Sequence, residues 1–67
     1  MEVYVVSFEC EPIHVFKNLD KAKQFVLWYV GNRFHLTEDE LNDEEAFINE
    51  HKYSEYGEVY IDIVPID

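Results

Sequence analysis

Sixty-seven residues suffice for one small domain, and a chain of this length buries only about 60% of the surface that its unfolded form exposes. A composition that is 48% hydrophobic and 16% aromatic is too apolar for a disordered tail, so we expect a single domain over residues 1–67. Fifteen Asp and Glu residues against five Lys and Arg give a formal net charge of −10. This charge argues against nucleic acid or an anionic membrane as a direct ligand, because phosphate groups are bound by cationic side chains.

The chain has a single cysteine, Cys10, which excludes an internal disulfide and a cysteine-rich zinc site and suits a reducing cytoplasm. The N-terminal segment 1–4 has neither the basic residues nor the apolar run of a signal peptide. No apolar stretch approaches the roughly 20 residues that cross a bilayer. We therefore expect a cytoplasmic protein without a membrane partner.

The first strand is predicted over 2–8, where a near-continuous apolar run is typical of a central strand covered on both sides. Residues 9–12 are predicted to form a turn, because Pro12 cannot donate to a sheet ladder. A second, shorter strand over 13–17 would complete a hairpin.

Two helices follow. Asn18 offers an N-cap for the first, whose apolar residues recur at spacings of three and four as far as Val30, and which ends between 31 and 33. Thr37 and Glu40 have the spacing of a capping box, which predicts a second helix as far as Glu50 or His51.

The last strand is predicted over 58–64, with Val59, Ile61 and Ile63 on its buried side. The resulting order, β-β-α-α-β, predicts an α+β domain in which two helices cover one face of a three-stranded antiparallel sheet. A small core and an exposed sheet edge also predict a homodimer.

The charge is distributed very unevenly along the chain. Residues 1–37 carry four acidic and four basic side chains, whereas residues 38–67 carry eleven acidic side chains against Lys52 alone. Like-charged pairs one helical turn apart, such as Asp39 and Asp43, each cost a helix about 0.2–0.5 kcal/mol, yet no Lys or Arg relieves them between 38 and 50. Either the second helix has a solvated face kept acidic for solubility, or its charge is directed at a basic partner.

The spacing favours a specific form of the second interpretation. Carboxylates one helical turn apart lie about 5–6 Å from each other, a distance similar to the phosphate spacing along a nucleic-acid strand. A rigid acidic stripe can therefore occupy the DNA-binding groove of a basic protein. The candidate partner-binding residues are Glu38, Asp39, Glu40, Asp43, Glu44, Glu45, Glu50, Glu55, Glu58 and Asp62.

Other functions have less support. Cys10 and His14 form a conceivable thiol–imidazole pair, but a turn cysteine beside a strand histidine is usually incidental. No glycine-rich phosphate loop, histidine pair or calcium-loop pattern is present, so we expect no enzyme, metal or cofactor. An alternative is a protein-interaction module or adaptor that uses Trp28, Phe34 and the tyrosines at 53, 56 and 60 as an aromatic patch, although tyrosines more often pack against the sheet.

Three segments carry a resemblance to a known group of proteins: residues 1–7, the Val15-Phe16 pair followed by Ala22-Lys23, and residues 58–61. The chain resembles the short acidic early proteins of lytic Bacillus phages. That group includes a small DNA mimic that inhibits the nucleoid-associated protein HU, and the chain is similar to it in size and charge. The resemblance implies a host-takeover protein that blocks a basic host DNA-binding protein, with HU as the first candidate. Reversal of Glu40, Asp43 and Glu44 to Lys is then expected to abolish competition with DNA while the fold survives.

Overall fold

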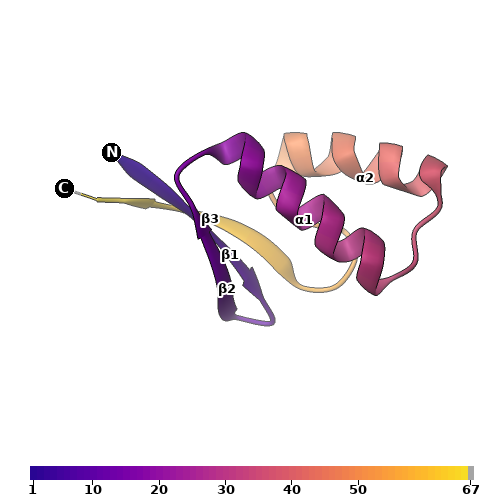
Figure 1. Cartoon of the computed structure of the whole chain (residues 1–67), viewed down its shortest axis with the longest axis horizontal. Helices are drawn as coiled ribbons and strands as arrows, with labels where there is room; N and C mark the ends of the chain where they lie inside the picture. The colour runs from indigo at the N-terminus through magenta and orange to yellow at the C-terminus, as the bar shows by residue number, and fades with distance from the viewer. Residues whose placement is uncertain (67) are drawn as a thin grey trace.

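The computed structural model of the chain describes residues 1–66, and Asp67, the last of the C-terminal acids, lies outside them. The chain forms an α+β domain with a three-stranded antiparallel sheet in the order β2-β1-β3 and two helices, as the sequence predicts (Figure 1). The most apolar strand is the central one. The elements are β1 (Glu2–Phe8), β2 (Glu11–Phe16), α1 (Leu19–Arg33), α2 (Glu38–His51) and β3 (Val59–Pro65).

The hairpin turn between β1 and β2 is tighter than predicted. Glu9 and Cys10 both have positive φ values, 50° and 68°, as a two-residue turn with the twist of its flanking strands requires. The prediction that Pro12 belongs to the turn is wrong, because Pro12 lies in β2 opposite Ser7. A proline is accommodated there because β2 is an edge strand and its register with β1 shifts between Val6 and Ser7.

Both predicted N-caps are present. The side chain of Asn18 accepts a hydrogen bond from the backbone N–H of Lys21 at 3.1 Å. At α2, the N–H of Glu40 donates to Thr37 Oγ1 at 3.3 Å, and the N–H of Thr37 donates to Glu40 Oε1 at 3.0 Å, which completes the capping box. The two helices therefore begin where their side chains replace the missing backbone acceptors.

Gly31 lies inside α1 rather than at its end. A Cβ added at Gly31 would lie only 2.8 Å from Leu41 Cδ2 of α2. The glycine thus allows α1 and α2 to approach each other closely, and the helix continues to Arg33.

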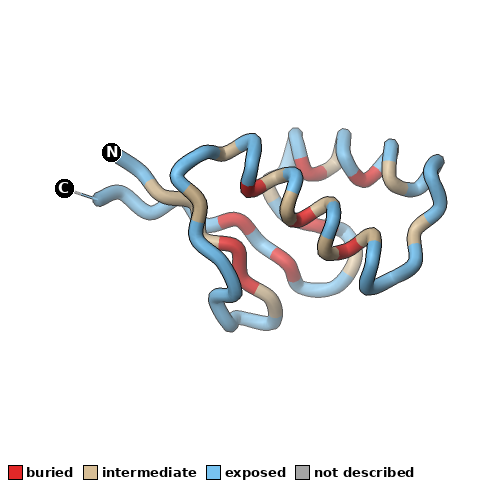
Figure 2. Tube along the Cα trace, in the orientation of Figure 1, coloured by how far each residue is buried: buried red, intermediate tan, exposed pale blue. Residues whose placement is uncertain are grey.

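The core lies between the helices and one face of the sheet. Figure 2 shows the buried positions of α1 and α2 on their inward sides, while the outer turns of α2 are exposed. The fully or nearly buried apolar side chains come from β1, β3 and both helices, namely Val6, Ala22, Val26, Val30, Ile48, Val59 and Ile61.

Two burial predictions are wrong. β1 is not covered on both faces, since both helices lie on the same side of the sheet and Val5 on the other side is only half-buried between Val15 and Asp62 of its neighbours (Figure 1). Ile63 is 43% exposed although it continues the inward side of β3. The end of the sheet near the two termini extends past the helices (Figure 1), and Ile63 belongs to the C-terminal half of β3.

Candidate functional site

The outer side of α2 carries a row of acidic side chains. Glu44 and Ile48 are its buried positions, so the opposite side of the helix faces solvent. Asp39 and Asp43 occupy that side one turn apart, and Glu50 follows two turns after Asp43, with Ala46 on the turn between them; all three acids are exposed. We call these three carboxylates the outer row.

Acidic side chains also flank the outer row. Glu38 and Glu45 are seven residues apart and lie on the side of α2 that turns toward α1, where Glu45 lines a cavity between the helices. Glu40 lies on the opposite flank and takes part in the capping box. Hydrogen bonds from the backbone N–H and the hydroxyl of Thr37 hold the pKa of the Glu40 carboxyl below its ordinary value.

None of these carboxylates is neutralised by a lysine or arginine. Within residues 1–66, the single acid–base contact within 4 Å joins His51 Nε2 to Glu50 at 3.9 Å. Arg33 instead stacks over the ring of Phe8, with its guanidinium carbon 4.6 Å from the ring centroid. The fold therefore leaves the charge of α2 available to an external cation.

Glu44 is a correction to the predicted surface. Its side chain is fully buried, so the expectation that it lies among the exposed contact residues is wrong. Glu44 Oε1 accepts a hydrogen bond from the backbone N–H of Glu55 at 3.2 Å, whereas the buried Oε2 has no hydrogen-bond partner among the described residues. Burial raises the pKa of the Glu44 carboxyl, and the hydrogen bonds from Glu55 and Ser54 only partly oppose this effect.

The segment that follows α2 brings further acids to its flank. The pKa of the Tyr56 phenol is raised, first by desolvation and then by the negative charges of Glu40, Glu55, Glu44 and Asp43. Tyr56 therefore lies inside a cluster of carboxylates drawn from α2 and from the connector. Glu55 extends the acidic surface in this direction.

Two other predicted residues lie elsewhere. Glu58 is anchored beside the β1–β2 turn, where its carbonyl accepts a hydrogen bond from the N–H of Glu9 at 2.9 Å. Asp62 is opposite Val5 and points away from the helices, because its neighbours Ile61 and Ile63 occupy the helix-facing side of β3. The expectation that Asp62 continues the acidic stripe is wrong, since side chains alternate between the two faces of a strand.

The aromatic side chains do not form one patch. Trp28 is 62% exposed and packs on Phe25, with ring centroids 5.9 Å apart. Phe34 packs instead on Tyr56, also at 5.9 Å. Tyr53 forms an isolated bridge with Tyr60 of β3, and both side chains are exposed, with ring centroids 6.4 Å apart.

Within residues 1–66 the structure does not join the candidate thiol–imidazole pair, and it contains no cluster of metal-binding side chains. His14 stacks on Phe25 at 5.3 Å and contacts Phe16, and no hydrogen bond joins it to the exposed Cys10. No group of three or more His, Cys, Asp or Glu side chains in this part of the chain could hold a metal ion. Neither described helix is both long and apolar enough to cross a membrane.

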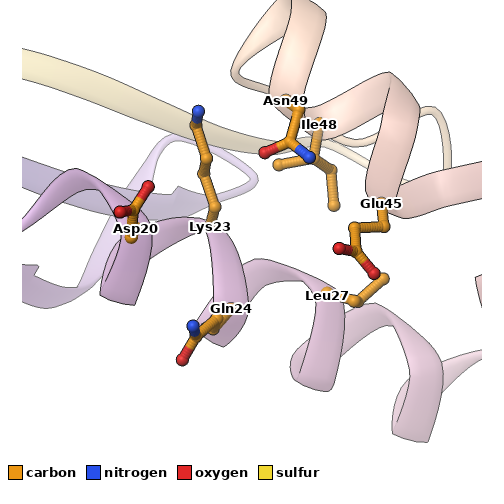
Figure 3. Close-up of a pocket in the computed structure, with 7 residues that line it drawn as sticks. All are labelled: Asp20, Lys23, Gln24, Leu27, Glu45, Ile48 and Asn49. Atoms are coloured by element: carbon orange, nitrogen blue, oxygen red, sulfur yellow. The ribbon is translucent and has the colours of Figure 1, made fainter.

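The seam between α1 and α2 is a feature that the sequence does not reveal. A cavity of about 260 Å³ lies between the helices, with Asp20, Lys23 and Leu27 on α1 and Glu45 and Asn49 on α2 (Figure 3). A second, more apolar cavity of about 390 Å³ continues along the seam and is lined by Gln24, Leu27, Trp28, Gly31, Asn32 and Leu41. The one sequence signal for it is Gly31, whose role in a close helix contact cannot be distinguished from a helix stop without coordinates.

Comparison with known proteins gives no relative: no family model, curated protein or solved structure matches the chain.

Proposed function

We propose that the chain is a non-enzymatic inhibitor that mimics DNA and occupies the DNA-binding surface of a basic protein. The contact surface consists of the outer row of α2, Asp39, Asp43 and Glu50, together with its exposed flanking acids Glu38, Glu40, Glu45 and Glu55. The observation that carries this proposal is that none of these carboxylates is paired with a Lys or Arg among residues 1–66.

Two physical effects make this surface suited to such a partner. All of these carboxylates except that of Glu55 are held on a capped helix, so their backbone positions are fixed before binding and little backbone entropy is lost on association. Their combined field attracts a cationic groove in the same way as a nucleic-acid backbone does, and accelerates encounter at low ionic strength.

A surface kept acidic only for solubility is the competing explanation. Solubility requires net charge but not the exclusion of lysines from a single helix. Four of the five basic residues lie in residues 1–37, and Lys52 follows the end of α2. This separation of charge favours a directed surface.

The proposal is tested by competition for DNA. HU is the first target to use, because the resemblance to the phage early proteins suggests it. HU bound to labelled duplex DNA is titrated with the chain, and we expect displacement of the DNA. In a direct calorimetric titration, the affinity of the chain for HU should fall steeply as the salt concentration is raised, because the contacts are between exposed charges.

The reversal of Glu40, Asp43 and Glu44 to Lys is not a suitable test variant. Glu44→Lys would place an unpaired cation at a buried position, and Glu40→Lys would remove the capping box, so both changes threaten the fold. The appropriate variant is Asp39→Asn/Asp43→Asn/Glu50→Gln, which changes only the outer row. We expect binding to fall roughly tenfold or more.

A matched control removes the same charge elsewhere. Glu2→Gln/Glu9→Gln/Glu11→Gln neutralises three exposed acids of the hairpin. If both triple variants reduced binding equally, net charge alone would account for the interaction and the assigned surface would be wrong.

The alternative function, an adaptor that binds through aromatic side chains, is favoured by one observation, the 62% exposure of Trp28. Such an interface would be insensitive to salt and to the outer-row variant. An affinity pull-down from bacterial lysate, with a parallel wash at raised ionic strength, separates the two functions through the identity and salt sensitivity of the captured protein.

A further inference from the structure

The α1–α2 seam joins an apolar surface to the acidic one. Gln24 and Leu27 line both cavities, so the two spaces form one groove along the seam. The larger part is mainly apolar, with Leu27, Trp28 and Leu41 as its walls. This part, of about 390 Å³, is an open hollow on the surface and is more open than the smaller cavity.

The charge around the groove restricts what can occupy it. Figure 3 shows the Glu45 carboxylate of α2 reaching toward Leu27 of α1, across the smaller cavity. Asp20 contributes a second negative charge at that end, and Lys23 is not within 4 Å of any carboxylate among the described residues. An occupant must therefore offer an apolar group to the larger cavity while meeting Glu45, the carboxylate that α2 contributes to the lining of the groove.

From this juxtaposition we propose that the groove binds a basic segment of the partner protein, which inserts one large apolar side chain between Trp28 and Leu41 and places its Lys or Arg residues over Glu45 and the neighbouring acids of α2. This inference rests on the proposed function, since it names the chemistry of the partner at the same helix. Charge complementarity selects this occupant: an acidic or uncharged apolar segment would leave the carboxylates of the groove unpaired at the interface.

The consequence is a contact that DNA itself does not make. Phosphate mimicry explains attraction to any DNA-binding groove, but it does not discriminate among basic proteins. An apolar anchor in a preformed pocket adds a contact that salt does not screen, and such anchors are common centres of binding energy in protein interfaces. The groove would therefore provide selectivity while the acidic surface provides attraction.

The test compares Trp28→Ala with the outer-row variant, using HU as the probe. We expect Trp28→Ala to weaken binding roughly tenfold or more, by the same factor at low and at raised ionic strength. The matched control is Tyr60→Ala, which removes an exposed aromatic side chain from the opposite layer and should leave affinity unchanged. Thermal unfolding of each variant establishes that its fold is retained.

A second measurement does not depend on a substitution. Trp28 is the single tryptophan of the chain, so its indole N–H gives one resonance when the chain is labelled with ¹⁵N and HU is not. Occupation of the groove should shift that resonance on addition of HU.

The outcomes separate this inference from the proposed function. Loss of binding in both the Trp28 and the outer-row variants, with a shifted indole resonance, supports the groove. If the outer-row variant alone loses binding and the indole resonance does not move, the groove is overturned while DNA mimicry stands. If Trp28→Ala alone loses binding, the acidic contact is overturned, and with it both proposals, in favour of an aromatic adaptor. Binding that neither variant reduces overturns both proposals as well.

Discussion

The buried carboxylate of Glu44 accepts a hydrogen bond at 3.2 Å from the backbone N–H of Glu55, and this bond ties the connector between α2 and β3 to the middle of the helix. No Lys or Arg lies within 4 Å of this carboxylate, and the atom Oε2 is buried without a hydrogen-bond partner among the described residues. A buried carboxyl group without a cationic partner is less stable in its ionised form than in its protonated form. The difference in free energy is on the order of several kcal/mol. Burial raises the pKa of the Glu44 carboxyl, so this residue stabilises the fold less when it is ionised than when it is protonated.

We expect Glu44→Gln to raise the free energy of unfolding at neutral pH by about 1 kcal/mol, because the amide keeps an acceptor for Glu55 and removes the charge. The folded-state pKa of Glu44 is raised above its ordinary value. The protonated Glu44 carboxyl therefore contributes to the free energy of unfolding in full below the unfolded-state pKa of 4.5. This contribution is lost as the pH rises through the folded-state pKa. The advantage of the variant should grow over that interval.

Urea unfolding as a function of pH measures this difference. Glu45→Gln is the control, because it removes the same charge from the exposed neighbour. Equal pH profiles for the two variants would contradict a special role for the buried carboxylate.

Asp43→Lys distinguishes a binding surface from a solubilising one. Asp39 and Asp43 repel each other one turn apart, and Lys at 43 would convert this repulsion into an attractive pair worth about 0.3–0.5 kcal/mol. We expect the variant to be slightly more stable than the natural chain and to bind the basic target more weakly. Thermal unfolding and calorimetric titration of the same sample test both expectations, and unchanged affinity would favour the solubilising explanation.

The two glycines should respond differently to alanine. Gly57 has a φ of +70°, and a Cβ there would lie 3.1 Å from Phe34 Cζ, so Gly57→Ala combines backbone strain with a close contact. We expect a loss of about 1–2 kcal/mol. Gly31→Ala should cost less, because the Leu41 side chain that it meets can rotate and alanine favours the helix by about 1 kcal/mol. Chemical denaturation of both variants provides the comparison, and the reverse order of stability would be inconsistent with these contacts.

The open face of the sheet is the surface on which the predicted homodimer is to be tested. Val15 is 56% exposed opposite the half-buried Val5, and Val3 pairs with the exposed Val64 on the same face. We expect Val15→Lys to shift the chain from dimer to monomer without loss of the core, because it introduces a charge into an apolar contact. Sedimentation velocity over a range of concentrations measures the shift. A natural chain that remained monomeric at the highest concentration would refute the dimer.

Local sequence patterns were sufficient for the elements and their order. The caps at Asn18 and Thr37 act within three residues, so their hydrogen bonds follow from spacing alone. The apolar run of β1 correctly marked the central strand, although one face of that strand is open. The concentration of negative charge after residue 37 also needed no coordinates.

Which of those charges act together was decided only by the tertiary structure. Glu44 and Glu45 are adjacent in the chain, yet one is buried under the connector and the other lines the seam between the helices, because the position of the core determines which side of α2 meets water. Asp62 does not belong to the acidic surface, because successive side chains of a strand point to opposite faces and the neighbouring Ile61 is packed toward the helices. The groove beside Trp28 lies where Gly31 of α1 approaches Leu41 of α2, and a contact between distant parts of the chain leaves no local trace in the sequence.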